Sequence, residues 1–138
     1  MNLTKNKSSF TLLEIIIVII IIGILASVAL PKFFKTVEFS RAQEALGSLG
    51  SVRSAMERCY LISRTFTPCV NFTSLDIADP GTTNIAHWAY TWAAPGPSTY
   101  TVTATRSTLD GGVATDTIAI NQDGTKTGTG NFTNVRGQ

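Results

Sequence analysis

The stretch from Phe10 to Pro31 reads FTLLEIIIVIIIIGILASVALP, and its one charged residue is Glu14. At about 1.5 Å per residue, a helix over this stretch is long enough to cross the hydrocarbon core of a bilayer. Each central Ile, Leu or Val favours insertion by about 0.5 kcal/mol, whereas a carboxylate at the bilayer centre costs roughly 3 kcal/mol. The stretch is therefore expected to insert despite Glu14. An isolated ionisable group in a membrane segment awaits a partner, which makes Glu14 the first candidate functional residue.

The residues before this stretch form a short polar segment, 1–9, whose only charges are Lys5 and Lys7. A secretory signal peptide places its small-residue cleavage site after the apolar run. Here the run continues into a long helical pattern, so cleavage after it is not expected. By the positive-inside rule, the two lysines keep the leader in the cytoplasm and place the C-terminal part outside.

Residues 8–14, SSFTLLE, resemble the processing site of the type IV pilins and of their relatives, the type II secretion pseudopilins. That family has a short basic leader, a cut before Phe in an FT-L-E block and an apolar helix. Gly23 and Pro31 fall where the family's helix commonly carries Gly and Pro. The resemblance covers residues 1 to about 60, with one departure: Ser9 stands where the family nearly always has Gly.

The resemblance implies how the chain is processed and assembled. A membrane-bound prepilin peptidase would cut between Ser9 and Phe10, removing residues 1–9, and would methylate the new Phe10 amine. Glu14, with Thr11, would set the register of assembly. Subunits would leave the inner membrane, with the help of the pilus assembly machinery, and form a homo-oligomeric helical filament outside the cell. No cofactor is implied.

Residues 10–64 predict one long helix in two halves. The segment 10–31 is apolar on all sides, as lipid or a filament core requires. Pro31 lacks a backbone donor and Gly23 is a second weak point, so a kink or local loosening is expected. Gly47 and Gly50 each cost the helix roughly 1 kcal/mol against Ala, so a close backbone contact is expected there. Apolar side chains recur at three- and four-residue steps in the second half, at Ala42, Leu46, Leu49, Val52, Met56 and Cys59.

Residues 65–138 are rich in Thr, Ser, Gly, Asn and Pro and predict a head built on a sheet. Residues 65–86 predict a loop. Alternating patterns predict strands over 88–92, 98–106 and 117–121, with a possible fourth over 125–129. An α+β fold follows, in which the long helix packs on a small antiparallel sheet of three to four strands. The tail from Gly128 is expected to be loosely held.

Cys59 and Cys69 are the only cysteines, and they suit an oxidising compartment. We expect a disulfide that pins the loop to the end of the helix. Closing so short a loop is worth roughly 2–3 kcal/mol in the chain-entropy account. The spacing is not C-x-x-C and no second ligand pair exists, so a redox or metal role is not favoured.

Other notable residues have ordinary structural interpretations. His87, the only histidine, is expected at a strand edge. A catalytic role is not favoured, because the sequence arranges no nucleophile or acid around it. Trp88 and Trp92 are interpreted as core or rim of the sheet rather than as a sugar platform. Three aspartates could together form a calcium site, but one carboxylate per turn is the usual composition of turns, so a metal site is not favoured. They are Asp110, Asp116 and Asp123.

Charge and aromatic placement narrow the class of protein further. The formal net charge of +2 equals the contribution of Lys5 and Lys7, so the processed chain is near neutral. No basic stripe interleaved with aromatic residues indicates nucleic-acid binding. Three aromatic residues near Pro31 are expected to pack between subunits, and they are Phe33, Phe34 and Phe39.

The function predicted by the sequence is that of a structural pilin, a subunit of a type IV pilus-like filament. A type II secretion pseudopilin is an alternative within the same family. A membrane-anchored binding module that never polymerises is an alternative from another class, although a mere anchor gains nothing from a buried acid at Glu14. An enzyme is the least favoured class. Adhesion, motility, DNA uptake and conduction are all compatible with such a fibre.

Overall fold

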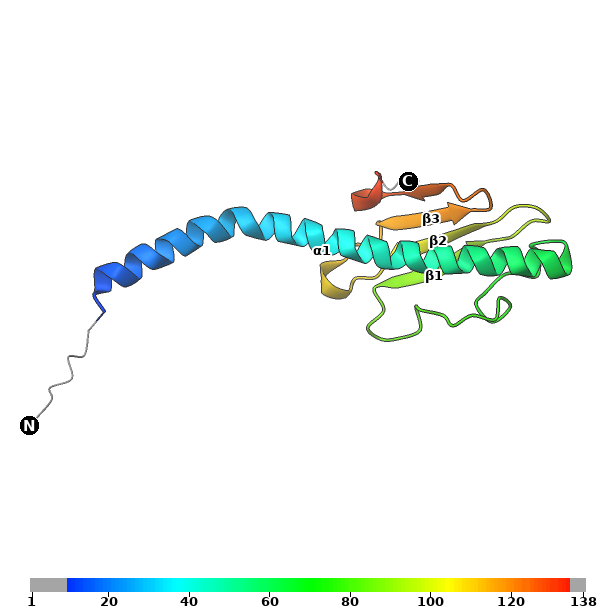
Figure 1. Ribbon diagram of the computed structural model, residues 1–138, viewed down its shortest axis with the longest axis horizontal. Coiled ribbons are helices and arrows are strands. Elements are labelled where there is room, and N and C mark those ends of the chain that lie inside the picture. The colour runs from blue at the N-terminus through cyan, green and yellow to red at the C-terminus, as the bar shows by residue number, and fades with distance from the viewer. Residues whose placement is uncertain (1–9, 135–138) are drawn as a thin grey trace, which may run out of the picture. The chain divides into compact units, whose positions relative to one another are not determined.

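The computed structural model describes residues 10–134; the predicted leader, 1–9, and the end of the predicted tail lie outside the described residues. One long helix, α1 (Leu12–Ser63), precedes a four-stranded sheet (Figure 1). The helix predicted over residues 10–64 is confirmed to within two residues at each end. The helix continues through Pro31 without ending there.

Both ends of α1 are fixed by local hydrogen bonds. At the start, the Thr11 Oγ1 accepts the backbone N–H of Glu14 at 3.2 Å, which makes Thr11 the N-cap. At the other end, Arg64 has a left-handed backbone with φ of 59°, and its N–H donates to the carbonyl of Tyr60 at 2.8 Å. A left-handed residue of this kind ends a helix and satisfies one of its last carbonyls.

The chain divides into two compact units, residues 1–38 and 39–138, and each is described by itself. In the first unit, every side chain from Phe10 to Thr36 is exposed except that of Ala26, which is half-buried. By length and composition alone, α1 contains a window apolar enough to cross a membrane, and no part of that window is buried.

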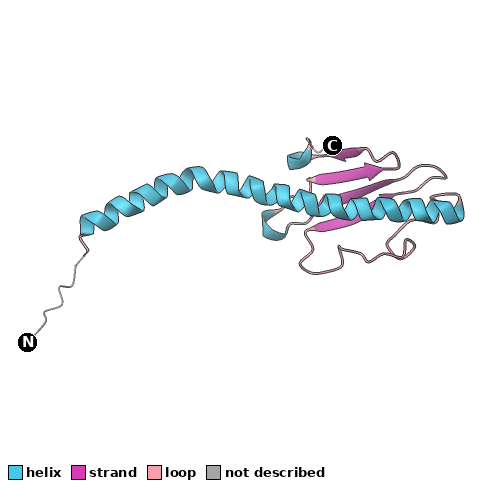
Figure 2. Ribbon diagram, in the orientation of Figure 1, coloured by secondary structure: helices cyan, strands magenta, loops and turns pink. Residues whose placement is uncertain are grey.

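The second unit contains the sheet, whose strands follow one another in the order β1-β2-β3-β4, all antiparallel (Figure 2). The three predicted strands and the possible fourth are confirmed. The second strand is shorter than predicted, because residues 98–100 precede it. The Gly96 N–H donates to the Thr99 carbonyl at 2.8 Å and closes a turn there. The strand bounds are β1 (Trp88–Ala93), β2 (Thr101–Arg106), β3 (Thr117–Asn121) and β4 (Lys126–Gly128).

The core of this unit lies between the second half of α1 and the inner face of the sheet. Leu49 and Met56 of the helix have no exposed surface, and neither does Val102 of β2. Burying a side chain of this size contributes about 1.5–3 kcal/mol. The helix residues fully buried in the core are Ala42, Ala45, Leu49, Val52, Ala55 and Met56, with Leu46 and Cys59 half-buried beside them. The predicted apolar stripe is therefore the face that packs on the sheet.

The close backbone contact predicted at Gly47 and Gly50 is wrong for the described residues. A methyl group added at either position meets no atom within 4 Å. Both glycines are exposed, because they lie off the apolar stripe and on the side of α1 that does not face the sheet.

The loop between α1 and β1 and the end of the described chain are both tied to the core by aromatic rings. Phe66 packs edge-on against Tyr100, and Phe72 packs edge-on against Trp92, with 4.8 Å between the ring centroids in each pair. Phe132, in the short 3-10 helix η2 (Gly130–Phe132), is 4% exposed and contacts Trp88 at 5.4 Å. The prediction of a loosely held tail is therefore wrong up to Phe132, because this ring fills the core.

Candidate functional site

The start of α1 carries the residues that the sequence singled out for assembly. The Thr11 side chain caps the helix through the Glu14 N–H, and the Thr11 carbonyl accepts the Ile15 N–H at 3.4 Å. Threonine at the cap with glutamate three residues later is the sequence pattern of a capping box. The structure thus brings Thr11 and Glu14 together, and it gives Thr11 a structural role that the resemblance alone did not supply. Glu14 lies in the first turn, where the helix dipole favours a carboxylate by about 0.3–1 kcal/mol.

From Ile15 to Leu30, α1 presents an apolar surface on every side. Its large hydrophobic side chains from Ile15 to Leu30 are all 40–64% exposed. Contiguous apolar surface of this extent marks a site that binds a membrane or another protein. The first unit therefore has the chemistry of a segment covered either by lipid or by other helices.

Near Pro31, aromatic side chains lie next to basic ones in the sequence. Phe33 and Phe34 are 61% and 63% exposed, with their ring centroids 6.1 Å apart. Lys32 and Lys35 flank them and are exposed too. Phe39, the third aromatic residue of this group, is 66% exposed. None of the three rings belongs to the buried core of the second unit, and their packing between subunits stays a prediction.

The predicted disulfide between Cys59 and Cys69 is confirmed. Cys69 has no exposed surface and Cys59 packs against the core. The bond joins the last turn of α1 to the loop at the point where Phe66 enters the core. No cysteine among the described residues is left as a free thiol.

A polar cluster joins α1 to the loop before β1 and to the connection between β2 and β3, and sequence reasoning did not find it. Arg41 Nη1 lies 3.0 Å from His87 Nδ1, and Arg41 Nη2 lies 3.2 Å from Asp110 Oδ2. The His87 Nε2 lies 3.1 Å from the same Asp110 oxygen, and Glu44 Oε2 lies 3.4 Å from Nδ1. Because a guanidinium only donates, Nδ1 accepts from Arg41 in this contact, and Nε2 donates to the Asp110 carboxylate. The partners are too far apart in sequence for any local pattern to indicate them.

The predicted position of His87 at a strand edge is confirmed, since it immediately precedes β1. Trp88 is confirmed as core at 2% exposure, and Trp92 is half-buried beside it. The Trp88 indole N–H donates to the backbone carbonyl of Arg41 at 2.9 Å. The polar cluster therefore lies next to the hydrogen bond by which Trp88 joins the sheet to the helix.

The three aspartates that suggested calcium are engaged separately. Asp110 belongs to the polar cluster, while Asp116 is 3% exposed and accepts the Asn131 backbone N–H at 3.1 Å. Asp123 accepts the side-chain amide of Gln122 at 2.9 Å. Within residues 10–134, no group of three or more His, Cys, Asp or Glu is arranged to hold a metal ion.

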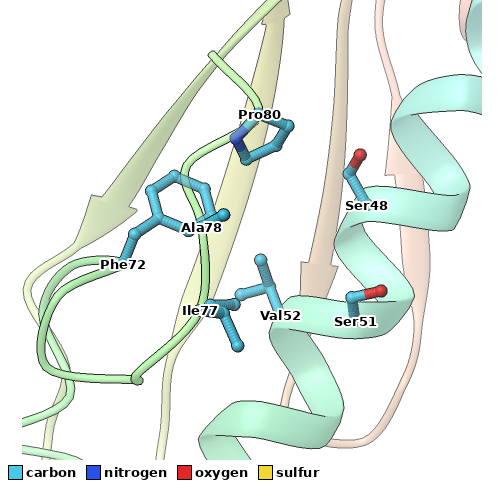
Figure 3. A pocket seen from close by; sticks show the side chains of 7 residues that line it. All are labelled: Ser48, Ser51, Val52, Phe72, Ile77, Ala78 and Pro80. Carbon is cyan, nitrogen blue, oxygen red and sulfur yellow. The ribbon is translucent and has the colours of Figure 1, made fainter. Parts of the chain in front are cut away.

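A groove of about 280 Å³ separates α1 from the loop around Ala78 (Figure 3). Val52 and Ile77 lie close together on its two walls, and Ser48 and Ser51 supply the hydroxyl groups. Tyr90 lies near this groove, and burial raises the pKa of its phenol. A hydrogen bond with Ser48 opposes this rise in pKa, whereas the Glu44 and Asp79 carboxylates increase it. The remaining lining residues are Phe72, Ala78 and Pro80.

Comparison with solved structures supports the fold. The non-core minor pilin PilV of Neisseria meningitidis superposes with a TM-score of 0.54 at 21% identity, covering 66% of this chain and 85% of that one. At this identity the similarity concerns the fold alone. It confirms a long N-terminal helix on an antiparallel sheet as the architecture of this chain.

Comparison of sequences identifies relatives among fimbrial and secretion proteins. The type IV major fimbrial protein FimA of Dichelobacter nodosus is 32% identical over 74 residues, which are 53% of this chain and 47% of FimA. The type II secretion system core protein G of Escherichia coli (strain K12) is 34% identical over 71 residues, which are 51% of this chain and 48% of that protein. The chain thus spans about half the length, or less, of the curated relatives it matches.

Two family profiles match consecutive parts of the chain. Residues 4–30 match the prokaryotic N-terminal methylation motif, which agrees with the predicted processing segment. Residues 31–117, well over half of the chain, match the profile described as type IV minor pilin ComP, DNA uptake sequence receptor. The chain therefore belongs to the type IV minor pilin ComP family and is a pilin with an N-terminal methylation motif.

Proposed function

We propose that this chain is made as an inner-membrane precursor, cut between Ser9 and Phe10, methylated at Phe10, and assembled through α1 as a subunit of a type IV pilus. Before assembly the first unit is held in lipid, with the head outside the cytoplasm. The observation that carries this proposal is the apolar surface from Ile15 to Leu30, exposed on all sides and preceded by a capped turn containing Glu14.

The cost of burying the Glu14 carboxylate gives assembly its preferred register between neighbouring helices. Placing the Glu14 carboxylate in an apolar environment costs roughly 3 kcal/mol. The dipole of its own helix returns only about 0.3–1 kcal/mol. Cleavage creates an α-amino group at Phe10, which is largely positive at neutral pH. A Phe10 amine from a neighbouring subunit supplies the missing opposite charge when two helices are offset axially by about one turn. Glu14 then sets the register of each incoming subunit.

Exchange of lipid for neighbouring helices has little hydrophobic cost, because both surroundings are apolar. Packing and the few polar groups must therefore decide assembly. Gly23 and Pro31 are proposed to loosen the helix where subunits pack together, and Phe33, Phe34 and Phe39 to fill the spaces between them. Prepilin peptidase and the pilus assembly machinery are the partners that this pathway requires.

A short periplasmic pseudopilus is the alternative within the family, and the similarity to a type II secretion core protein favours it. A second candidate function is DNA binding at the fibre surface, since the family description names a DNA uptake sequence receptor. DNA affinity depends on cations that reach phosphates. Arg106 of β2 is fully buried, whereas Arg58 and Arg64 are exposed at the end of α1. The end of α1 is therefore the surface on which DNA retention by purified fibres is to be tested, with Arg58→Gln as the variant.

The deciding experiment compares Glu14→Leu with the control Ile17→Leu. The control also introduces a leucine in the apolar segment but leaves the Glu14 carboxylate in place. Membrane fractionation, intact mass and the yield of shear-released fibres are measured side by side. Glu14→Leu is expected to insert and be cleaved like the natural chain but to give few or no fibres, while Ile17→Leu gives normal yield. A normal fibre yield from Glu14→Leu would remove the basis of the proposal. Fibres confined to the periplasm would favour the pseudopilus.

A further inference from the structure

His87 lies among charged side chains from several elements of the second unit. Its own side chain is 18% exposed. In the described part of the chain, the charged side chains that meet it come from α1, β2 and the connection between β2 and β3, and they are Arg41, Glu44, Arg106 and Asp110. The Arg106 Nη1 donates to the backbone carbonyl of His87 at 3.2 Å. The imidazole ring itself therefore faces the other three.

The backbone around His87 is held by hydrogen bonds that do not involve the ring. The Ser107 N–H donates to the His87 carbonyl at 2.8 Å, and the Ser107 hydroxyl donates to the Ala86 carbonyl at 3.0 Å. The next residue, Trp88, is 2% exposed. The ring is therefore kept at the same place beside α1, whichever protons it carries.

The Asp110 carboxylate decides which ring nitrogen carries the first proton. Its Oδ2 lies 3.1 Å from His87 Nε2, and an ionised carboxylate only accepts hydrogen bonds, so Nε2 carries the N–H. Asp110 lies in the short 3-10 helix η1 (Leu109–Gly111) and has a left-handed backbone with φ of 52°. A residue with a side chain keeps this conformation when its surroundings hold it there. A second proton on the ring is therefore left to Nδ1.

The Nδ1 atom of His87 lies between a donor and an acceptor. Arg41 Nη1, at 3.0 Å, only donates, whereas the ionised Glu44 carboxylate, with Oε2 at 3.4 Å, only accepts. An unprotonated Nδ1 accepts from Arg41 and has no proton for Glu44. A protonated Nδ1 has no lone pair for Arg41 and carries a like charge, but its N–H has Glu44 as an acceptor. Each state of the ring thus has its own partner at the same nitrogen.

From this arrangement we propose that His87 is a pH-dependent tie between α1 and η1, which exchanges Arg41 for Glu44 at Nδ1 when the ring takes up a second proton. The proton comes from water, and the N–H at Nδ1 is the one covalent bond that forms. Nε2 stays on Asp110 in both states, so the ring joins η1 to α1 before and after the exchange. The cluster passes from one net negative charge to none, because two carboxylates face one guanidinium.

The exchange matters for a head that meets changes of pH. Histidine is the side chain that ordinarily changes its charge between about pH 5 and 8. A ring held by Arg41 alone would repel its partner on protonation and loosen η1, whereas the Glu44 carboxylate replaces the lost contact. In the function proposed above the head lies outside the cytoplasm, where it meets the pH of its surroundings. The exchange itself needs only the folded head, so it is tested on protein that has not assembled.

The first measurement locates the protons on the ring. The full chain is prepared in detergent without a histidine tag, labelled with a heavy nitrogen isotope in its histidine, and followed by NMR. Because His87 is the only histidine, both ring nitrogens are identified directly. At about pH 8 we expect a proton on Nε2 and an Nδ1 that accepts a hydrogen bond, and at about pH 5 a proton on both. A proton on Nδ1 and none on Nε2 at the higher pH would overturn the inference.

Two variants of Glu44 separate the contact from the charge. Glu44→Gln removes the carboxylate, and Glu44→Asp keeps the charge on a side chain that is one methylene too short for the contact. Both are expected to weaken binding of the second proton by about two- to five-fold, as for a partly exposed charge pair. Arg41→Met is expected to strengthen it, since the competing donor and its like charge are gone.

Glu57→Gln is the matched control for the loss of a carboxylate. Glu57 is also an exposed residue of α1 that pairs with an arginine, Arg53, at 3.2 Å. It lies about 20 Å further along the helix than Glu44, so its loss is expected to leave the titration of the ring unchanged. Glu44 variants that titrate like the natural chain, or a control that shifts as far as they do, would overturn the inference. A shift in Glu44→Gln with none in Glu44→Asp would indicate a charge effect without the exchange, and would overturn it as well. These readings are independent of fibre yield, which alone decides the proposed function.

Discussion

The indole N–H of Trp88 donates a hydrogen bond to the backbone carbonyl of Arg41 across 2.9 Å. The ring is 2% exposed and contacts Phe132, so one side chain joins α1, β1 and the end of the described chain. Around it, the Arg41 side chain reaches His87 and Asp110. Trp88 therefore fixes one point of contact between the helix and the sheet, beside the polar cluster of Arg41, His87 and Asp110.

Trp88→Phe should lower the free energy of unfolding of the head by roughly 1 kcal/mol for the lost hydrogen bond, plus the cost of a partly empty site. Trp88→Ala should cost about 3–5 kcal/mol. Chemical denaturation of the full chain in detergent, followed by tyrosine fluorescence, measures both. Thr91→Val, on the opposite face of the same strand, is the control and should change little. Equal stability of Trp88→Ala and the natural chain would contradict the anchor.

Cys59→Ser should lower the free energy of unfolding by roughly 2–3 kcal/mol, because the unfolded chain loses a short covalent loop. Membrane insertion should be unchanged, since the first unit contains no cysteine. Alkylation of the natural protein without reductant should label neither thiol, and labelling after reduction should reach both. Quantitative labelling before reduction would show that the bond is absent from the cellular protein.

Processing is expected before Phe10, but more slowly than in a Ser9→Gly variant, since Ser9 replaces the glycine usual in the family. Pulse labelling with intact-mass measurement gives the rate for both chains. Ser8→Gly, one position away, serves as the control for a change of flexibility alone. Assembled fibres that still carry residues 1–9 would disprove cleavage at this site.

Alkaline pH should destabilise the head through Tyr100. Burial raises the pKa of its phenol above the ordinary value of about 10, with the Arg53 charge opposing the rise. The folded chain therefore keeps this proton to higher pH than the unfolded chain does. Stability is complete below the unfolded pKa and falls as pH rises through the folded one. Denaturation midpoints of the natural chain and Tyr100→Phe across that range measure the effect, and parallel curves for the two would contradict it.

The pairing of His87 with Arg41 and Asp110 shows the limit of reading the sequence. The alternating pattern of side chains from Trp88 predicts a strand that begins directly after His87, and this is correct. Such a pattern has a period of two residues and is therefore visible in a short segment. Its partners are on the helix and in the short 3-10 helix between β2 and β3, and their meeting depends on how the sheet packs on α1. The expected contact at Gly47 and Gly50 was wrong for the same reason, since the sequence alone does not say what covers the far side of a helix.

By itself the sequence determined the elements whose causes are local. The apolar run from Phe10 to Pro31 and its acid Glu14 follow from length and composition alone. The stripe through Leu49 and Met56 and the alternating strands follow from periods of 3.6 and 2 residues. Only the tertiary structure decided the anchor of Trp88 on Arg41, the burial of Phe132 and the register that lines up Thr91, Thr103 and Thr127. These depend on which surfaces meet, and that choice is made by the packing of the whole core rather than by any short segment.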